Sequence, residues 1–167
     1  MKKAFTLVEI LIVVAILGIL AAIALPTLQG HIAEARESAA KDILRILRSA
    51  IEVYTAEHNG VPPGYVNGQV GSGVLTFQKQ MICTTDINGN VSGSTVQSKE
   101  FPFGPYLKKV PINPFAGDRR PVVILDDDEP FPEEATGELS WIYKPATKEI
   151  RLNWPSTDSE GVRYFDY

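Results

Sequence analysis

One carboxylate, that of Glu9, lies inside an otherwise apolar run of 21 residues from Phe5 to Leu25. As a helix with a rise of 1.5 Å per residue, this run would be about 31 Å long, which matches the hydrocarbon core of a bilayer. A carboxylate near the start of such a helix costs about 1–3 kcal/mol in lipid unless another group compensates its charge. We therefore expect Glu9 to find a partner, and the chemistry that it offers is that of an ion pair.

A second group of carboxylates lies in the last third of the chain. Asp126, Asp127 and Asp128 stand in a row, and Asp158 lies in the C-terminal tail. Calcium takes six to eight oxygen ligands, so these four aspartates are candidate ligands of a calcium ion. The alternative is an acidic stretch that is solvated and holds no metal.

Residue types that serve catalysis are scarce. The only histidines, His31 and His58, fall on a predicted helix or at its end, and we expect both to be exposed. Cys83 is the only cysteine, so no intramolecular disulfide can form, and its neighbours favour burial. The chain contains no Gly-x-Ser-x-Gly, Cys-x-x-Cys, phosphate-binding glycine loop or zinc-binding helix motif. The sequence therefore predicts a structural protein and not an enzyme.

Charge limits the partners and sets the orientation. The formal net charge is −4, which excludes a strongly basic field, so we expect no nucleic-acid partner. Lys2 and Lys3 precede the apolar run, and the positive-inside rule keeps them in the cytoplasm while the chain after Pro26 crosses the membrane. A cleaved secretory signal is an alternative, although its apolar core would be shorter. An ordinary uncleaved anchor is another, and it leaves Glu9 unexplained.

Helical periodicity continues beyond the apolar run. Residues 27–58 carry one apolar stripe with helical spacing, made of Ile43, Ile46, Leu47, Ala50, Ile51 and Tyr54. Asn59-Gly60 and Pro62-Pro63 are typical of a helix end. We expect one long helix, whose first half lies in a membrane or a filament core and whose second half packs on a folded head.

The remainder of the chain predicts that head. Residues 61–120 are rich in proline and glycine, with one short amphipathic helix at 74–85. Residues 121–125, 139–144 and 149–153 have the alternation of strands and predict an antiparallel meander. The expected fold class is α+β, with a long N-terminal helix packed on a small antiparallel sheet of three to four strands.

The segment from Lys2 to Glu9 (KKAFTLVE) resembles the class III signal of type IV pilins and of type II secretion pseudopilins. The resemblance implies cleavage between Ala4 and Phe5 by a prepilin peptidase, followed by N-methylation of Phe5. That family usually has glycine before the cut, where this chain has Ala4. Glu9 matches the acidic residue of the family, and Pro26 falls at its helix-kinking proline. The freed amine of Phe5 could then pair with Glu9 of a neighbouring subunit, which would compensate both charges.

Two head segments, at 104–115 and 141–153, resemble the heads of major pseudopilins of type II secretion. This resemblance implies a helical spine with a three- or four-stranded sheet, and such heads often bind one calcium ion in a C-terminal loop. It also implies the partners: other copies of the chain, the prepilin peptidase, minor pseudopilins and an inner-membrane assembly platform.

The leading hypothesis is therefore a subunit of a periplasmic pseudopilus that drives type II protein secretion, anchored by a single pass in the bacterial inner membrane with its head in the periplasm. A surface type IV pilin for adhesion, motility or DNA uptake is the second hypothesis. A membrane-anchored binding or enzymatic domain is the third. The predicted parts are a leader (1–4), a transmembrane or filament-core helix (5–25), its amphipathic continuation (26–60), a variable region (61–120), and the sheet with its tail (121–167).

Overall fold

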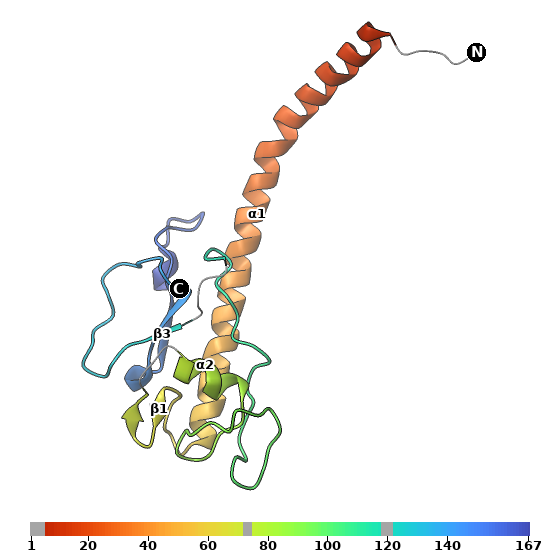
Figure 1. Ribbon diagram of the computed structural model, residues 1–167. Helices are drawn as coiled ribbons and strands as arrows, with labels where there is room; N and C mark the ends of the chain where they lie inside the picture. Colours follow the sequence, from red (N-terminus) through yellow and green to blue (C-terminus); the bar gives the residue numbers. More distant parts are fainter. Residues whose placement is uncertain (1–5, 72–74, 118–121) are drawn as a thin grey trace. The chain divides into compact units, whose positions relative to one another are not determined.

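A computed structural model describes residues 6–71, 75–117 and 122–167, with backbone but not side chains described for 24–29, 123 and 124 (Figure 1). The chain divides into two units, Met1–Arg36 and Glu37–Tyr167. We call the second unit the head.

The first helix, α1, runs from Leu7 to Glu57 and confirms the predicted long helix. It ends where the sequence predicts, because Asn59 and Gly60 take positive φ angles of 55° and 85°. The Gly60 amide donates to the carbonyl of Thr55 at 2.9 Å, which satisfies one of the last carbonyls of the helix.

Within the described residues, we find no helix that combines the length and the hydropathy needed to cross a membrane. The predicted span began at Phe5, which lies outside the described residues.

Three strands form the main sheet in the order β3 (Val122–Ile124), β4 (Trp141–Lys144) and β5 (Glu149–Leu152). The β4–β5 pair is the antiparallel hairpin that the sequence predicts, and it turns through the 3₁₀ helix η1 (Pro145–Thr147). The meander does not extend to β3, which pairs with β4 in parallel. The long connection between β3 and β4 carries the chain back to the same end of the sheet, as a parallel pair requires.

The variable region contains more regular structure than expected. The short predicted helix is present as α2 (Leu75–Ile82). A short antiparallel hairpin lies in a part of this region where we expected a loop. Its strands are β1 (Tyr65–Val66) and β2 (Gln69–Val70). Its turn is Asn67-Gly68, both with positive φ, the geometry of a two-residue hairpin turn.

The core of the head lies between one face of α1, the sheet and α2. Its large buried side chains are Leu44, Leu47, Ile51, Tyr54, Phe77, Met81, Trp141, Tyr143, Ile150 and Leu152. Part of the predicted stripe was wrong. Ile46, which the prediction included, is 50% exposed, whereas Leu44, which it omitted, is 1% exposed. The buried face therefore repeats every three to four residues from Ala40 through Leu47 to Tyr54.

Candidate assembly site

Glu9 begins α1 together with Thr6. The Glu9 carboxylate accepts hydrogen bonds from the backbone amide and the hydroxyl of Thr6, each at 2.8 Å. In return, the Glu9 amide donates to the Thr6 hydroxyl at 3.2 Å. This reciprocal arrangement is a capping box, in which the cap residue and the third residue of the helix satisfy each other's amides.

The structure thus gives Glu9 a partner inside its own chain, where only an ion pair with another group was expected. The signal was present, because Thr6-Leu7-Val8-Glu9 has the capping-box spacing of a threonine followed three positions later by glutamate. The predicted intermolecular partner, the amine of Phe5, and the predicted cleavage site after Ala4 lie outside the described residues.

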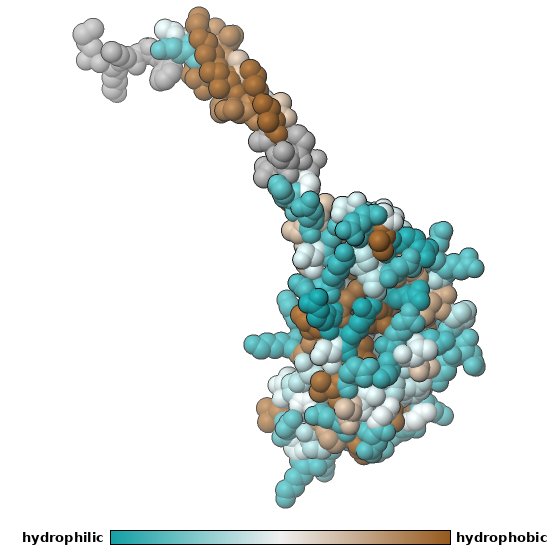
Figure 2. Space-filling model, turned by 180° about the vertical axis from the view of Figure 1, so that it is seen from behind, coloured by the Kyte–Doolittle hydropathy of each residue, from teal (hydrophilic) through white to brown (hydrophobic). Residues whose placement is uncertain are grey.

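The first part of α1 exposes an almost continuous apolar surface. The leucines, isoleucines and valines between Leu7 and Ile23 are each 48–81% exposed. Figure 2 shows this surface as a dense block of hydrophobic residues at one end of the chain. At Gly18, a built Cβ atom would meet nothing within 4 Å, so a neighbouring helix could approach the backbone closely. A surface of this kind requires lipid or other helices to cover it.

Two other residues of the first unit were singled out by the sequence. Helix α1 continues through Pro26, whose side chain is outside the described part, so its role in loosening the helix stays a prediction. His31 is exposed on the helix, as expected, and lies 3.6 Å from the Glu34 carboxylate.

The Asp158 carboxylate is buried, with its side chain 1% exposed. One oxygen accepts the amides of Glu160 and Val162, both at 2.9 Å. The other accepts the Tyr167 hydroxyl at 2.7 Å and lies 3.6 Å from the Lys41 ammonium. The Tyr167 hydrogen bond, supported by these amides and by Lys41, holds the pKa of Asp158 below its ordinary value of 3.8. Two backbone amides, a hydroxyl and an ammonium group of the protein thus occupy the carboxylate oxygens that a calcium ion would need.

The other candidate calcium ligands lie apart from such a cage. Asp126, Asp127 and Asp128 are exposed, and the Asp127 carboxylate accepts a hydrogen bond of 2.5 Å from the Tyr65 hydroxyl. Among the described residues, no group of three or more histidine, cysteine, aspartate or glutamate side chains could hold a metal ion. The structure therefore does not bring Asp126, Asp127, Asp128 and Asp158 together as one calcium site.

His58 is buried, so the expectation that it is exposed was wrong. Its ring stacks on Tyr54 with the centroids 3.7 Å apart. Nδ1 donates to the Tyr54 carbonyl at 2.8 Å, which leaves Nε2 to accept from the Thr85 hydroxyl at 3.0 Å. Burial lowers the pKa of His58 below 6.5. Helical spacing alone could have indicated this, because His58 lies four residues after buried Tyr54. Cys83, expected to be buried, is half-buried.

Comparison with known proteins agrees with the site at the start of α1. Residues 1–25 match the family described as the prokaryotic N-terminal methylation motif. This motif and the exposed apolar helix define a class of membrane-anchored subunits that form filaments.

Curated relatives identify the family within that class. The chain is 34% identical over 117 residues to fimbrial protein EcpC of Eikenella corrodens, covering 59% of this chain and 74% of the relative. It is 27% identical over 156 residues to type IV major pilin protein PilE1 of Neisseria gonorrhoeae, covering 88% of this chain and 93% of the relative. It is 40% identical over 75 residues to type IV major fimbrial protein FimA of Dichelobacter nodosus, covering 45% and 47%. The chain belongs to the type IV pilin superfamily.

These relatives are structural proteins, and the chain is accordingly a filament subunit and not an enzyme. No solved structure matches the chain.

Proposed function

We propose that this chain is a subunit that polymerises through the first half of α1, in which Glu9 sets the register between neighbouring copies. The observation that carries the proposal is the exposed apolar surface from Leu7 to Ile23 with one carboxylate at its start. Lipid would cover that surface before assembly, and the helices of other copies would cover it afterwards.

Glu9 gains a second partner in this proposal. A prepilin peptidase cuts between Ala4 and Phe5, and the new Phe5 amine is methylated and carries a positive charge. A carboxylate has about four lone-pair sites, so Glu9 can keep its hydrogen bonds to Thr6 and still accept the Phe5 amine of a neighbouring copy. In a medium of low dielectric, neither charge is stable alone, so the pair favours one stagger between adjacent helices.

Anchoring follows the positive-inside rule. Lys2 and Lys3 stay on the cytoplasmic side of the bacterial inner membrane, where the peptidase cuts the chain, and the head reaches the periplasmic side. Polymerisation then draws subunits from the membrane into the filament.

We favour a surface type IV pilus as the filament, because the relatives PilE1 and FimA are named as its major subunits. A periplasmic pseudopilus of type II secretion is the second candidate. The head segments at 104–115 and 141–153 resemble those of pseudopilins, and the lone Cys83 excludes the paired-cysteine loop of many type IV pilins. In that case minor pseudopilins would be additional partners.

The role of Glu9 can be tested with two substitutions. Glu9→Leu removes both the capping hydrogen bonds and the charge, whereas Glu9→Gln keeps a side chain that suits a capping box and removes only the charge. We expect both variants to enter the membrane and neither to appear in sheared filaments. If Glu9→Gln assembles like the wild type, the capping box explains the carboxylate and the pairing role is refuted.

A deletion strain separates the two filaments. Loss of surface filaments, with normal export of secreted proteins, would support the pilus. Exported proteins that accumulate in the periplasm of cells with normal surface filaments would support the pseudopilus.

A further inference from the structure

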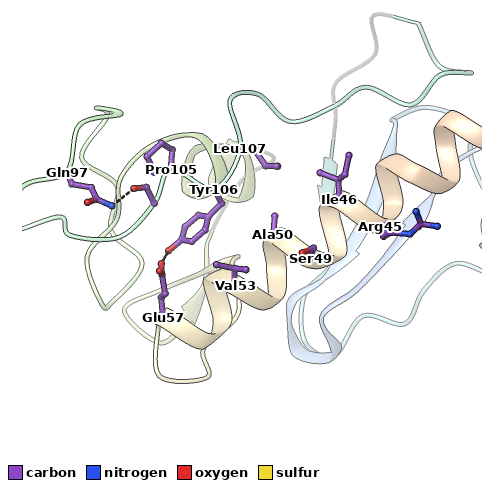
Figure 3. Close-up of a pocket in the computed structure, with 11 residues that line it drawn as sticks. Arg45, Ile46, Ser49, Ala50, Val53, Glu57, Gln97, Pro105, Tyr106 and Leu107 are labelled. Atoms are coloured by element: carbon purple, nitrogen blue, oxygen red, sulfur yellow. Dashed lines mark hydrogen bonds between the residues drawn. The ribbon is translucent and has the colours of Figure 1, made fainter.

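A groove runs along one flank of the second half of α1 (Figure 3). Its helical side carries Ile46 and Val53, which are 50% and 48% exposed. Its opposite side is the segment from Gly104 to Leu107. The groove has a volume of about 620 Å³, and its lining is mainly apolar.

Hydrogen bonds fix the walls of this groove. The Tyr106 hydroxyl donates to the Glu57 carboxylate at 2.6 Å, which ties the 104–107 segment to the end of α1. The Gln97 amide donates to the Gly104 carbonyl at 2.8 Å (Figure 3). Because both walls are held in place within the chain, the groove is a preformed surface.

The opposite flank of α1 is already covered by the sheet and the tail. Arg48 donates to the carbonyls of Ile150 at 3.3 Å and Tyr167 at 2.6 Å. Lys148 pairs with Glu52 at 2.8 Å. The two flanks of the helix thus differ in kind, since one packs within the head and the other leaves apolar side chains exposed.

Unpaired positive charge lies close in sequence to two residues of the groove. Lys99 follows the groove residue Gln97 by two positions, and Lys108 and Lys109 follow the groove residue Leu107 directly. All three lysines are exposed, and none of them takes part in an ion pair among the described residues.

Unpaired negative charge lies on the connection between β3 and β4. Residues 126–138, which we call the acidic loop, contain seven acidic residues and no basic one. All seven are exposed, and no ion pair between described residues uses any of them. In Figure 1 this loop lies on the other side of α1 from the 104–107 segment. Pro130, at the centre of the loop, adds an exposed apolar side chain.

We propose that the groove receives the acidic loop of a second copy of this chain. The inference rests on the proposed function, since only a polymer brings many copies of the head together. Two acidic loops repel each other, whereas an acidic loop beside Lys108 and Lys109 gains complementary charge. The two surfaces are different and belong to the same chain, so the contact is heterologous and can repeat along a filament without closing into a ring.

Charge reversal tests the contact in cells that assemble the full chain. Lys108→Glu with Lys109→Glu places like charge beside the acidic loop, and we expect about tenfold fewer sheared filaments. Adding Asp128→Lys and Glu133→Lys should restore most of the loss. Lys79→Glu, on α2, is the matched control and should leave assembly unchanged. Full assembly of the lysine double variant, or failure of the compensating pair to restore assembly, would overturn the proposal.

Cross-linking tests the geometry directly. Val53→Cys and Pro130→Cys, combined in a Cys83→Ser chain, should give a ladder of dimers, trimers and larger species when filaments are oxidised. Each single-cysteine variant should give no ladder. Normal filaments without a ladder, or a cross-link from the Val53→Cys variant to a protein of another mass, would refute the contact while leaving polymerisation intact. If the wild-type chain forms no filament at all, the proposed function fails first, and the docking contact fails with it.

Discussion

The two halves of α1 differ in how far their aliphatic side chains are exposed. Between Leu7 and Ile23, the leucines, isoleucines and valines are each 48–81% exposed. Between Ala40 and Tyr54, Leu44, Leu47 and Ile51 are 0–1% exposed. Both parts are helical, so helix propensity does not distinguish them. The second part is buried by residues of its own chain, and the first is left for other molecules to bury.

This difference separates the residues that stabilise the folded head from those that become buried only when the chain meets other molecules. Burying an aliphatic side chain contributes about 1.5–3 kcal/mol, so the head gains its stability within one chain. The residues from Leu7 to Ile23 gain theirs only from lipid or from other copies. A change between Leu7 and Ile23 should therefore damage assembly with no effect on the stability of the head, and a change in the core of the head should lower that stability.

The largest effect is expected from a charge in the exposed region. Leu17→Asp places a carboxylate at a position that is 59% exposed in the single chain, at a cost of about 2.5–3.5 kcal/mol in a bilayer. We expect membrane retention and filaments to be lost, as measured by fractionation and shearing. The melting temperature of the head should not change. Leu17→Ala is the control, and a parallel loss of head stability with Leu17→Asp would contradict the separation of the two regions.

The reverse experiment uses neighbouring residues in the head. Leu47→Ala removes a fully buried side chain from the core and should lower the free energy of unfolding by about 2–5 kcal/mol. Ile46→Ala, one residue away and half exposed, should cost about 0.5 kcal/mol or less. Chemical denaturation of the full chain in detergent measures both. Equal costs would place the core on the stripe that the sequence predicted and not on the one in the structure.

Ile46 and Leu47 also show how much of the fold could be predicted from the sequence. Periodicity predicted the long helix. It placed both Ile46 and Leu47 on one apolar stripe and could not choose between them, because both have helical spacing. The choice depends on which flank the sheet and the tail cover, and those contacts join residues about a hundred positions apart, such as Arg48 with Ile150 and Tyr167.

The candidate sites also differ in whether they depend on residues that are near or far apart in the sequence. The Thr6–Glu9 capping box depends on residues three apart and could have been predicted from the sequence. The donors around Asp158 include Lys41, a residue far away along the chain, so its burial could not be foreseen. The parallel pairing of β3 also depends on the path of a long connection, which periodicity does not determine.

A smaller effect on the stability of the head is expected when the pH is lowered, because the buried histidine His58 titrates. Burial holds the pKa of His58 in the folded head below 6.5, so the unfolded chain binds a proton more readily. Stability should be constant above about pH 6.5 and should decrease as the pH falls from there towards the lowered pKa of the folded state. Melting temperatures between pH 8 and pH 5 measure this decrease.

Two variants isolate His58 as the cause. His58→Gln cannot titrate, and its melting temperature should depend less on pH over that range than that of the wild type. His31→Gln removes the exposed histidine and should leave the wild-type dependence unchanged. If the two substitutions alter the pH profile equally, burial of His58 is not responsible for the decrease.

The smallest effect is expected at a hydroxyl inside the core. Tyr143 is fully buried, and its hydroxyl has no hydrogen-bond partner among the described residues. Tyr143→Phe removes that hydroxyl and keeps the ring against Phe77, so we expect the free energy of unfolding to rise by about 1 kcal/mol. Tyr164→Phe is the matched control, because its hydroxyl bonds to Glu37 at 3.0 Å and its loss should lower stability. Thermal unfolding of the three chains decides the matter: a loss of stability in Tyr143→Phe as large as that in Tyr164→Phe would mean that the Tyr143 hydroxyl is satisfied in solution.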